Sequence, residues 1–243
     1  MNGYEKSARF YDLFDEKQSV GFFGRYAAQA GRILDVGAGT GRIGIPLARQ
    51  GIHVVCVEPS PAMRRQLLEK LRTCPHVRDR IELLPDDAAS FHLDRTFPVA
   101  CLSGTFDHFL DHEERLASLK NVVHHLEPGG TLVFDVFVGL MTSSPLASAG
   151  RCQRGDRQYH RFVGREALPG ERIRVDLVYE AYHSGELVDR IEEASTVGIT
   201  SREEIHGLLA EVGCRLLHEF SDYDSTPFRE GDDLLIVEAA YRL

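Results

Sequence analysis

The stretch RILDVGAGTGRIG occupies residues 32–44 and decides the fold. Its first part, residues 33–36, is mostly apolar and predicts a buried strand. The run Gly37–Gly41 then places three glycines within five residues, which predicts a tight turn that lets the backbone approach a ligand closely. A helix is expected next, over residues 42–50. Strand, glycine turn and helix together begin a βαβ unit of the kind that binds nucleotides.

The alternation of strand and helix continues to residue 138. Further strands are expected at residues 53–58, 80–84, 99–102 and 131–138. Helices are expected at residues 61–72 and 112–126, and the run Pro128-Gly129-Gly130 should end the second of them. This order is typical of a parallel sheet that is covered by helices on both faces.

A different pattern follows the fifth strand. From residue 158 to residue 199, apolar and polar residues alternate with period two, and residues 184–185 supply a turn. We therefore expect an antiparallel insert over residues 139–199. The arginine-rich stretch 151–165 is interpreted as a solvated, mobile segment that precedes these strands.

The C-terminal part should complete the domain. Ser201 and Glu204 have capping-box spacing, which predicts a helix as far as Gly213. Residues 216–220 and 234–240 are expected to form a closing hairpin. We predict one domain, with N-terminal helices (1–30) over the substrate, a cofactor-binding core (31–138), the insert (139–199) and a closing segment (200–243).

Composition limits the classes of partner. The 243 residues are 43% hydrophobic and carry a formal net charge of −9, which argues against a nucleic-acid backbone as partner. The longest apolar stretch, residues 131–141, contains Asp135 and is too short to span a membrane. The start of the chain has no apolar signal region, and the five cysteines show no CxxC spacing, so reduced thiols in the cytoplasm are expected.

The glycine run fits two nucleotide cofactors. Residues 39–44 match the dinucleotide fingerprint GxGxxG, whereas residues 37–41 match a loop that holds S-adenosylmethionine. Asp35 favours the second interpretation, because a buried carboxylate is costly without a partner and would repel a pyrophosphate. The same carboxylate suits the α-ammonium group of S-adenosylmethionine. Glu58, after the second strand, is placed to accept hydrogen bonds from both ribose hydroxyls.

From Ile33 to about Val138, these motifs resemble the class I S-adenosylmethionine-dependent methyltransferases. The resemblance implies a Rossmann-like α/β three-layer sandwich with a small antiparallel β insert after the fifth strand, and S-adenosylhomocysteine as the cofactor product. It also implies that Asp87 and Ala88 contact the adenine amine. The expected cofactor-binding residues are Asp35, Gly37, Ala38, Gly39, Thr40, Gly41, Glu58, Pro59, Ser60, Met63, Asp87, Ala88, Ser103 and Gly104.

The acceptor is expected to be a small molecule that is methylated at nitrogen. An N-terminal segment with Tyr4 and Tyr11, followed by an insert after the fifth strand, resembles glycine, sarcosine and amino-sugar N-methyltransferases. Residues 4–14 and 105–108 also resemble the toxoflavin-type azapteridine N-methyltransferases. The candidates for orienting the acceptor or taking its proton are His108, Asp107 and Tyr11. Substrate contacts are expected from Tyr4, Tyr11, Thr105, Phe106, His108 and Tyr223.

Several alternatives stay open at this point. His108 and His112 have a spacing that could serve zinc, but no third ligand is evident, and no metal is expected. Residues 103–106 lack the Asn/Asp-Pro-Pro-Tyr/Phe run of enzymes that methylate DNA bases, so nucleic acid is not expected as substrate. The remaining rivals are O- or C-methylation, an NAD(P)-dependent oxidoreductase and a non-catalytic regulator that binds the cofactor.

Overall fold

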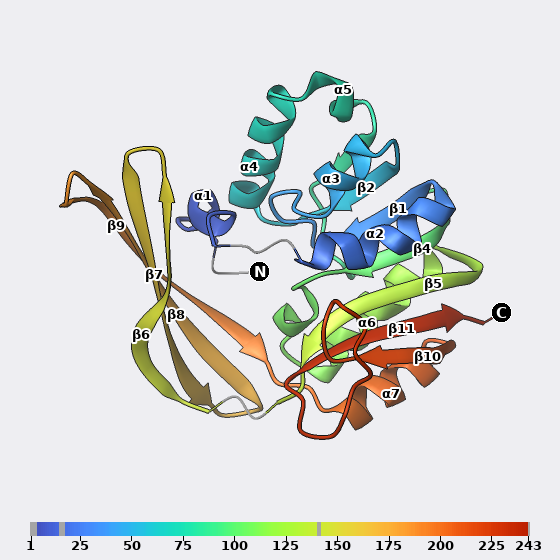
Figure 1. Ribbon diagram of the computed structural model, residues 1–243. Helices are drawn as coiled ribbons and strands as arrows, with labels where there is room; N and C mark the ends of the chain where they lie inside the picture. The colour runs from blue at the N-terminus through green and yellow to red at the C-terminus, as the bar shows by residue number, and fades with distance from the viewer. Residues whose placement is uncertain (1–3, 15–17, 140–141, 243) are drawn as a thin grey trace.

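Two β-sheets organise the residues that the computed structural model describes, which are 4–14, 18–139 and 142–242 (Figure 1). The larger sheet has seven strands in the order β10-β11-β5-β4-β1-β2-β3. Their bounds are Arg32–Val36 (β1), His53–Val57 (β2), Ile81–Leu84 (β3), Phe97–Leu102 (β4), Leu126–Phe137 (β5), Cys214–Phe220 (β10) and Leu234–Tyr241 (β11). Strands β1 to β5 are parallel, and β11 is antiparallel to both of its neighbours. This order departs from the sheet of dinucleotide-binding proteins, in which the sixth strand follows the fifth directly.

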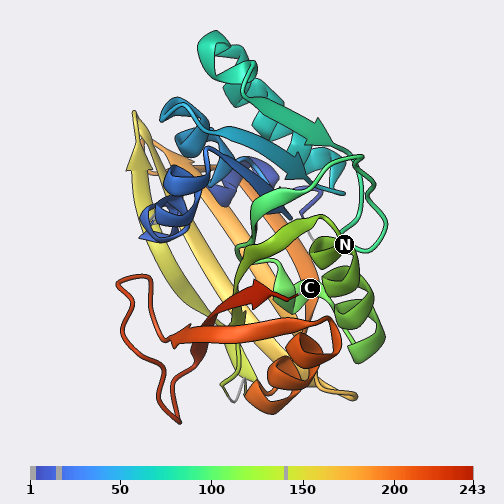
Figure 2. The same ribbon diagram turned by 90° about the vertical axis from the view of Figure 1, so that its right-hand side faces the viewer.

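Helices cover both faces of this sheet, so the core has three layers (Figures 1 and 2). Alternate residues of β1 face different layers, because successive side chains of a strand point to opposite faces. Ile33 packs with α2 (Gln18–Ala30), α3 (Gly44–Arg49) and α4 (Pro61–Arg72). Leu34 packs in the core that includes α6 (His112–His124) and α7 (Arg202–Glu211). Two short helices complete this part, α5 (Pro75–Arg78) and the 3-10 turn η1 (Phe106–His108).

The start of β5 differs from the expected turn. The run Pro128-Gly129-Gly130 lies inside the strand, which begins at Leu126. Phe97 of β4 pairs with Leu126 and Val99 pairs with Thr131, so the residues between them form a bulge. Gly129 has a φ of +78°, which glycine adopts without strain, and the bulge therefore replaces the predicted stop.

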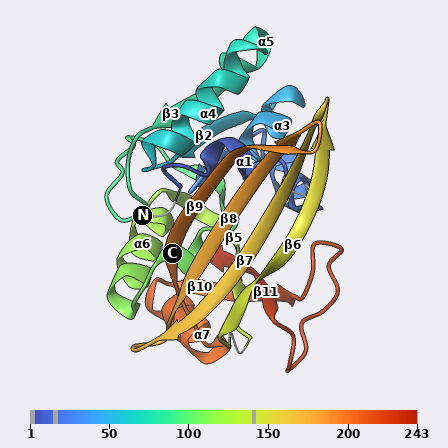
Figure 3. The same cartoon turned by 90° about the vertical axis from the view of Figure 1, so that its left-hand side faces the viewer.

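The smaller sheet is the antiparallel insert, and it has one strand more than the alternation predicted. Its strands are Ser144–Arg154 (β6), Arg157–Leu168 (β7), Arg172–His183 (β8) and Glu186–Gly198 (β9), in sequence order. The arginine-rich stretch 151–165 is not a segment ahead of this sheet but forms parts of β6 and β7. The insert curves around the short helix α1 (Ala8–Tyr11), which lies between it and α4 (Figures 1 and 3).

The C-terminal expectations are largely confirmed. The Ser201 side chain accepts a hydrogen bond from the backbone N–H of Glu204 at 3.1 Å, as a cap of α7 should. The Glu204 carboxylate does not complete the capping box, because it binds the buried guanidinium of Arg115 at 3.0 Å. Across the described residues, every helix is too short or too polar to cross a bilayer.

Candidate active site

The glycine loop begins where β1 ends and turns sharply under a neighbouring loop. Gly37 has a φ of +74°, and its N–H donates to the carbonyl of Val57 at 2.8 Å. A Cβ at this position would lie 2.8 Å from the Cβ of Thr105, and closer still to the rest of that side chain. The loop after β4 therefore packs directly on the backbone of Gly37, which leaves no room for any other residue type.

Glu58 stands at the end of β2 with its carboxylate turned toward the glycine loop. One oxygen accepts from the N–H of Gly39 and the other from the N–H of Ser60, both at 2.8 Å. Burial raises the pKa of Glu58, and these two backbone hydrogen bonds act against that increase. A carboxylate has about four acceptor sites, so two remain for a ligand with paired hydroxyls. Glu58 and Met63 line a hollow of about 30 Å³ together with Gly37 and Gly39.

Asp35 lies deeper, beneath the loop, and does not line this hollow. Its side chain is 1% exposed, and its Oδ2 atom has no hydrogen-bond partner among the described residues. Burial raises its pKa to about 7, and the charge of Arg42 opposes that increase. A cation bound nearby would favour the charged form of Asp35.

Asp35→Asn is expected to reduce the loss of stability that accompanies rising pH. The folded chain holds this proton up to a pKa of about 7, whereas the unfolded chain releases it near the ordinary pKa of 3.8. Stability therefore falls as pH rises through that window. The full effect is on the order of 4 kcal/mol. Melting temperatures from pH 4 to pH 8 measure it, with the exposed Asp86→Asn as control. Parallel pH curves for Asp35→Asn and the parent chain would contradict the assignment.

A further buried carboxylate, Asp135, orders the loop after β4. Its oxygens accept from the Gly104 N–H at 2.5 Å, the Ser103 hydroxyl at 3.1 Å and the Tyr223 hydroxyl at 2.8 Å. Arg42 donates to the Ser103 hydroxyl at 2.9 Å and so reaches the same network. In the sequence, Asp135 is a lone charge inside the apolar stretch 131–141, and that anomaly is the signal of its role.

Four carboxyl groups are buried around the glycine loop. Asp35, Glu58, Asp107 and Asp135 are all buried at the carboxyl ends of the strands, and burial raises the pKa of each. Ionising several buried carboxyl groups so close together costs free energy unless a positive charge binds next to them. The electrostatics of this end of the sheet therefore favour a cationic ligand.

The N-terminal segment is fastened over the loop. The hydroxyl of Thr40 donates to Asp12 at 2.7 Å, and Lys70 of α4 binds both Asp12, at 2.5 Å, and the carbonyl of Thr40, at 2.8 Å. On the other side, Glu193 of β9 accepts from the backbone N–H of Ser7 at 2.9 Å. This segment thus connects the nucleotide loop with the insert.

Tyr4 and His108 form a hydrogen-bonded pair between the hollow and a larger cavity. The Tyr4 hydroxyl lies 2.8 Å from Nε2 of His108. Burial lowers the pKa of His108 to about 4, so the imidazole is neutral at pH 7 and has one nitrogen that can accept a hydrogen bond. Tyr11 packs edge-on against Tyr4 and lines both spaces. Asp107 also faces the larger cavity; burial raises its pKa to about 7, and one of its oxygens accepts from the Phe137 N–H at 3.1 Å.

The larger cavity has a volume of about 360 Å³ and lies between the core and the insert. Gly104, Asp107, His108 and Phe137 line its core side. The insert contributes Arg161, Val163 and Arg165 from β7 and Val175, Leu177 and Tyr179 from β8. Of the cavity residues, only Tyr4, Tyr11, Gly104, Asp107 and His108 were predicted from the sequence to belong to the site. The period-two spacing of the insert residues was the available signal, since it places them on one face of the insert.

Other expected contacts lie elsewhere. Phe106 is fully buried and stacks on Phe134 in the core, so it forms no wall of the cavity. Tyr223 lies behind the loop, where its hydroxyl binds Asp135, and it does not line the cavity either. Asp87 is exposed and accepts from the Ala89 N–H at 2.9 Å. Ser60 caps α4 by accepting from the Met63 N–H at 3.3 Å.

Four further expected residues, Ala38, Gly41, Pro59 and Ala88, form hydrogen bonds through their backbone groups. Arg64 binds the carbonyl of Pro59 at 2.6 Å, and Asn121 binds that of Ala88 at 3.0 Å. The backbone N–H of Ala38 donates to Val57 at 3.1 Å, and that of Gly41 donates back to Ala38 at 2.9 Å. In the part of the chain that the structure describes, no three His, Cys, Asp or Glu side chains are grouped to hold a metal ion.

Comparison with known proteins agrees with this arrangement. Residues 34–132 match the family model of a methyltransferase domain. Over 106 residues the chain is 37% identical to a cypemycin N-terminal methyltransferase from a Streptomyces species. The aligned region covers 42% of this chain and 40% of that protein. The match spans between 39% and 44% of the length of the first three curated relatives.

Two solved structures share the whole fold. The CcbJ methyltransferase from Streptomyces caelestis has a TM-score of 0.81 at 18% identity, over 98% of this chain and 97% of that one. The sugar N-methyltransferase KedS8 from Streptoalloteichus sp ATCC 53650 has a TM-score of 0.75 at 22% identity, over 97% and 92% respectively. The predicted fold class, including the antiparallel insert, is confirmed.

Proposed function

We propose that this chain is a class I S-adenosylmethionine-dependent methyltransferase and transfers a methyl group to a nitrogen atom of a small molecule. The observation that carries the proposal is the ring of buried carboxyl groups around the glycine loop, next to a cavity of about 360 Å³. S-adenosylmethionine brings a sulfonium and an α-ammonium group, and both cations suit that potential. The N-methyltransferases among the compared proteins support nitrogen as the acceptor atom.

The residues of the chain fit the cofactor in distinct ways. Glu58 has two acceptor sites left for the ribose hydroxyls. Gly37 and its neighbours in the loop allow the methionine part to approach the backbone. The ammonium group would favour the charged form of the buried Asp35 and pair with it electrostatically. Met63 offers an apolar contact to the nucleoside, and Asp87 with Ala88 remains the proposed site for the adenine amine. The bound cofactor supplies the activated methyl group and its own leaving group.

The protein contributes orientation and one proton-accepting group. Holding the acceptor nitrogen in line with the methyl group is worth roughly 7–11 kcal/mol in favourable cases. The neutral His108, with its Nε2 engaged by Tyr4, orients the acceptor at the boundary between hollow and cavity. Asp107 has the better pKa for a general base near neutral pH, because burial raises it to about 7. We infer that Asp107 takes the proton that the nitrogen releases.

The direct test is the mass and position of the product. The chain is incubated with S-adenosylmethionine that carries a deuterated methyl group, together with pairs of small amines and the alcohols or phenols of the same shape. We expect labelled methyl on nitrogen. If the labelled methyl group were found on oxygen or carbon alone, the proposal would be wrong and the chain would be an O- or C-methyltransferase. Tight binding of adenosylhomocysteine without turnover on any acceptor would support the non-catalytic regulator instead.

His108→Ala is expected to lower kcat by about ten- to a hundredfold and to change the affinity for adenosylhomocysteine by about twofold at most. The imidazole lines the acceptor side, so its loss should act on turnover. Steady-state kinetics at saturating cofactor and calorimetry separate the two effects. His112→Ala is the matched control, because His112 pairs with Glu204 and does not line the cavity. A normal kcat in His108→Ala would remove this residue from the mechanism.

An azapteridine ring is a second candidate acceptor. The exposed face of Phe137, whose side chain is 47% exposed at the cavity wall, favours a flat ring over an aliphatic amine. An acidic ring N–H would also give up its proton to Asp107 readily. The labelled-methyl assay with azapteridine acceptors tests this toxoflavin-type function.

A further inference from the structure

We propose that Arg165 binds an anionic group of the acceptor, a carboxylate or a phosphate, and that Arg161 adds to the positive potential there. The acceptor would then be an amine that carries an anion at the end opposite its reacting nitrogen. This inference rests on the proposed function, because it assigns the substrate class of the same cavity.

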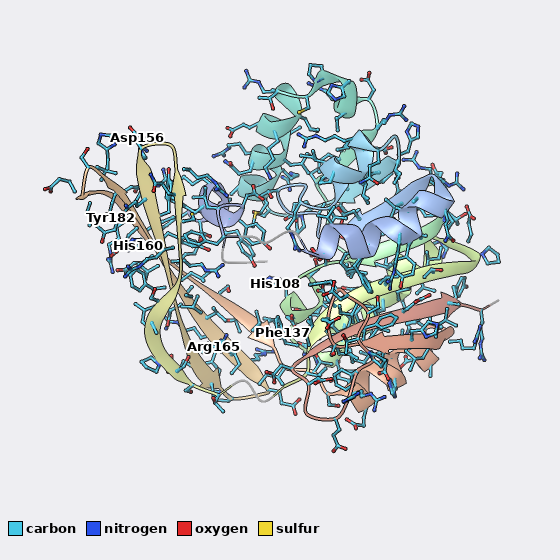
Figure 4. The ribbon with its side chains drawn as sticks, viewed as in Figure 1. His108, Phe137, Asp156, His160, Arg165 and Tyr182 are labelled. Atoms are coloured by element: carbon cyan, nitrogen blue, oxygen red, sulfur yellow. The ribbon has the colours of Figure 1, made fainter. Side chains whose placement is uncertain are left out.

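The two arginines reach the cavity from one strand. Arg161, Val163 and Arg165 follow each other at every second position of β7 and line the same wall. His108 lies on the core side of the cavity, across from Arg165 of the insert (Figure 4). Asp107, its neighbour in η1, also lines the cavity. The cavity therefore has its acid and imidazole near the methyl position and its guanidinium groups on the insert.

Arg161 is held by the protein itself. It donates to the carbonyl of Ala149 at 3.1 Å, and its guanidinium lies 5.1 Å from the ring centre of Phe14. Its Nε atom is buried and has no hydrogen-bond partner among the described residues. Arg161 is therefore held in place, and it raises the electrostatic potential of the cavity without having to move toward a ligand.

Arg165 differs, because its guanidinium has no hydrogen bond or ion pair within the described part of the chain. Asp107 is the acidic residue of the cavity wall, but the charges that shift its pKa are those of Asp135 and Arg115. Asp107 is therefore not the ion-pair partner of Arg165. The side chain of Arg165 is exposed at the cavity, beside its cross-strand neighbour Val175. Its five N–H donors are thus available to an incoming anion.

The chemistry of the walls favours an anion over a neutral polar group. Val163, Val175 and Leu177 make the insert side largely apolar, so a charged pair formed there is only partly hydrated. Hydrogen bonds to charged groups are stronger in such surroundings, and a guanidinium binds carboxylate or phosphate in a bidentate manner. An acceptor with this polarity would be turned so that its nitrogen faces His108 and Gly104.

Arg151 provides the matched control. It pairs across the sheet with His160, which alternates with Arg161 and therefore points to the outer face. Arg151 is exposed and lies in the neighbouring strand, but it does not line the cavity. Removing it changes the net charge of the insert as much as removing Arg165 does.

The test is binding to the whole chain saturated with adenosylhomocysteine, measured by calorimetry at low ionic strength. The probes are benzoate, phenyl phosphate and benzyl alcohol. The unmodified chain should bind at least one anion about tenfold or more tightly than the alcohol. Arg165→Met should abolish this preference, Arg165→Lys should restore part of it, and Arg151→Met should keep it. Benzoate and phenyl phosphate distinguish the two sources of the anion.

No preference for either anion in the unmodified chain, or a preference that survives in Arg165→Met, would overturn the proposal. Methyl transfer is a separate measurement, in which phenylalanine is compared with phenethylamine, the same amine without the carboxylate. If the anion site exists but no amine is methylated, the proposed function fails and the site stands. If amines are methylated equally with and without the carboxylate, and Arg165→Met changes neither, the function stands and the anion site fails.

Discussion

Replacing Glu58 by glutamine is expected to weaken the binding of adenosylhomocysteine by at least about a hundredfold. The carboxylate of Glu58 is held by the N–H groups of Gly39 and Ser60, which leaves two acceptor sites for the ribose hydroxyls. Hydrogen bonds to a charged group contribute about 1.5–3 kcal/mol each, and the amide nitrogen of glutamine would also place a donor against the N–H of either Gly39 or Ser60. Calorimetric titration of the purified variant measures the loss.

Two controls separate recognition from folding in this experiment. Glu82→Gln alters an exposed carboxylate on β3, in the same sheet, and should leave the affinity unchanged. The melting temperature of Glu58→Gln without ligand reports any damage from the altered contacts with the loop. A folded Glu58→Gln variant that binds adenosylhomocysteine as tightly as the parent chain would refute the placement of the ribose.

Gly37→Ala is expected to destabilise the fold by about 2–4 kcal/mol and to remove measurable cofactor binding. Two costs combine here. The φ of +74° is unfavourable for alanine, and the new Cβ would overlap the buried side chain of Thr105. The overlap would push apart the two loops between which the methionine part is proposed to lie. Chemical denaturation and calorimetry measure the two effects.

Gly51→Ala is the matched control for Gly37→Ala. Gly51 also has a positive φ, +94°, but a Cβ there meets nothing within 4 Å. It should therefore show the backbone cost alone, about 1 kcal/mol, with normal cofactor affinity. Equal behaviour of the two variants would mean that crowding against Thr105 is unimportant.

The sheet of the core could be predicted because burial patterns are local. Mostly apolar runs such as residues 33–36 are buried on both faces of the sheet, so each of them predicts a strand from its own sequence. The first strand of the insert could not be predicted in this way. Residues 144–154 are mostly exposed and lack a regular apolar pattern, and their pairing comes from β7. The start of β5 could not be predicted for a similar reason, because its bulge depends on the pairing with β4.

The site was predictable where a residue type was anomalous for its element. Asp35 and Glu58 stood out as acids at the ends of apolar strands, and both are buried beside the glycine loop. Phe106 was assigned by its neighbours in sequence, and this failed for a geometric reason. Residues 106–108 form a 3-10 turn, in which successive side chains point about 120° apart. Asp107 and His108 therefore reach the cavity while Phe106 enters the core.

The helix α1 and the residues around it close two compartments at once. Tyr4 and Tyr11 line the hollow beside Glu58, and with Phe14 they also line the acceptor cavity. Because Asp12 ties this segment to Thr40 and Lys70, we expect exchange of spent cofactor for fresh cofactor to open it and so to remove one wall of the neighbouring cavity. A product that has gained one methyl group is then free to leave before a second transfer. Any double methylation by this chain should accordingly be distributive, with the singly methylated compound building up in solution before the doubly methylated one.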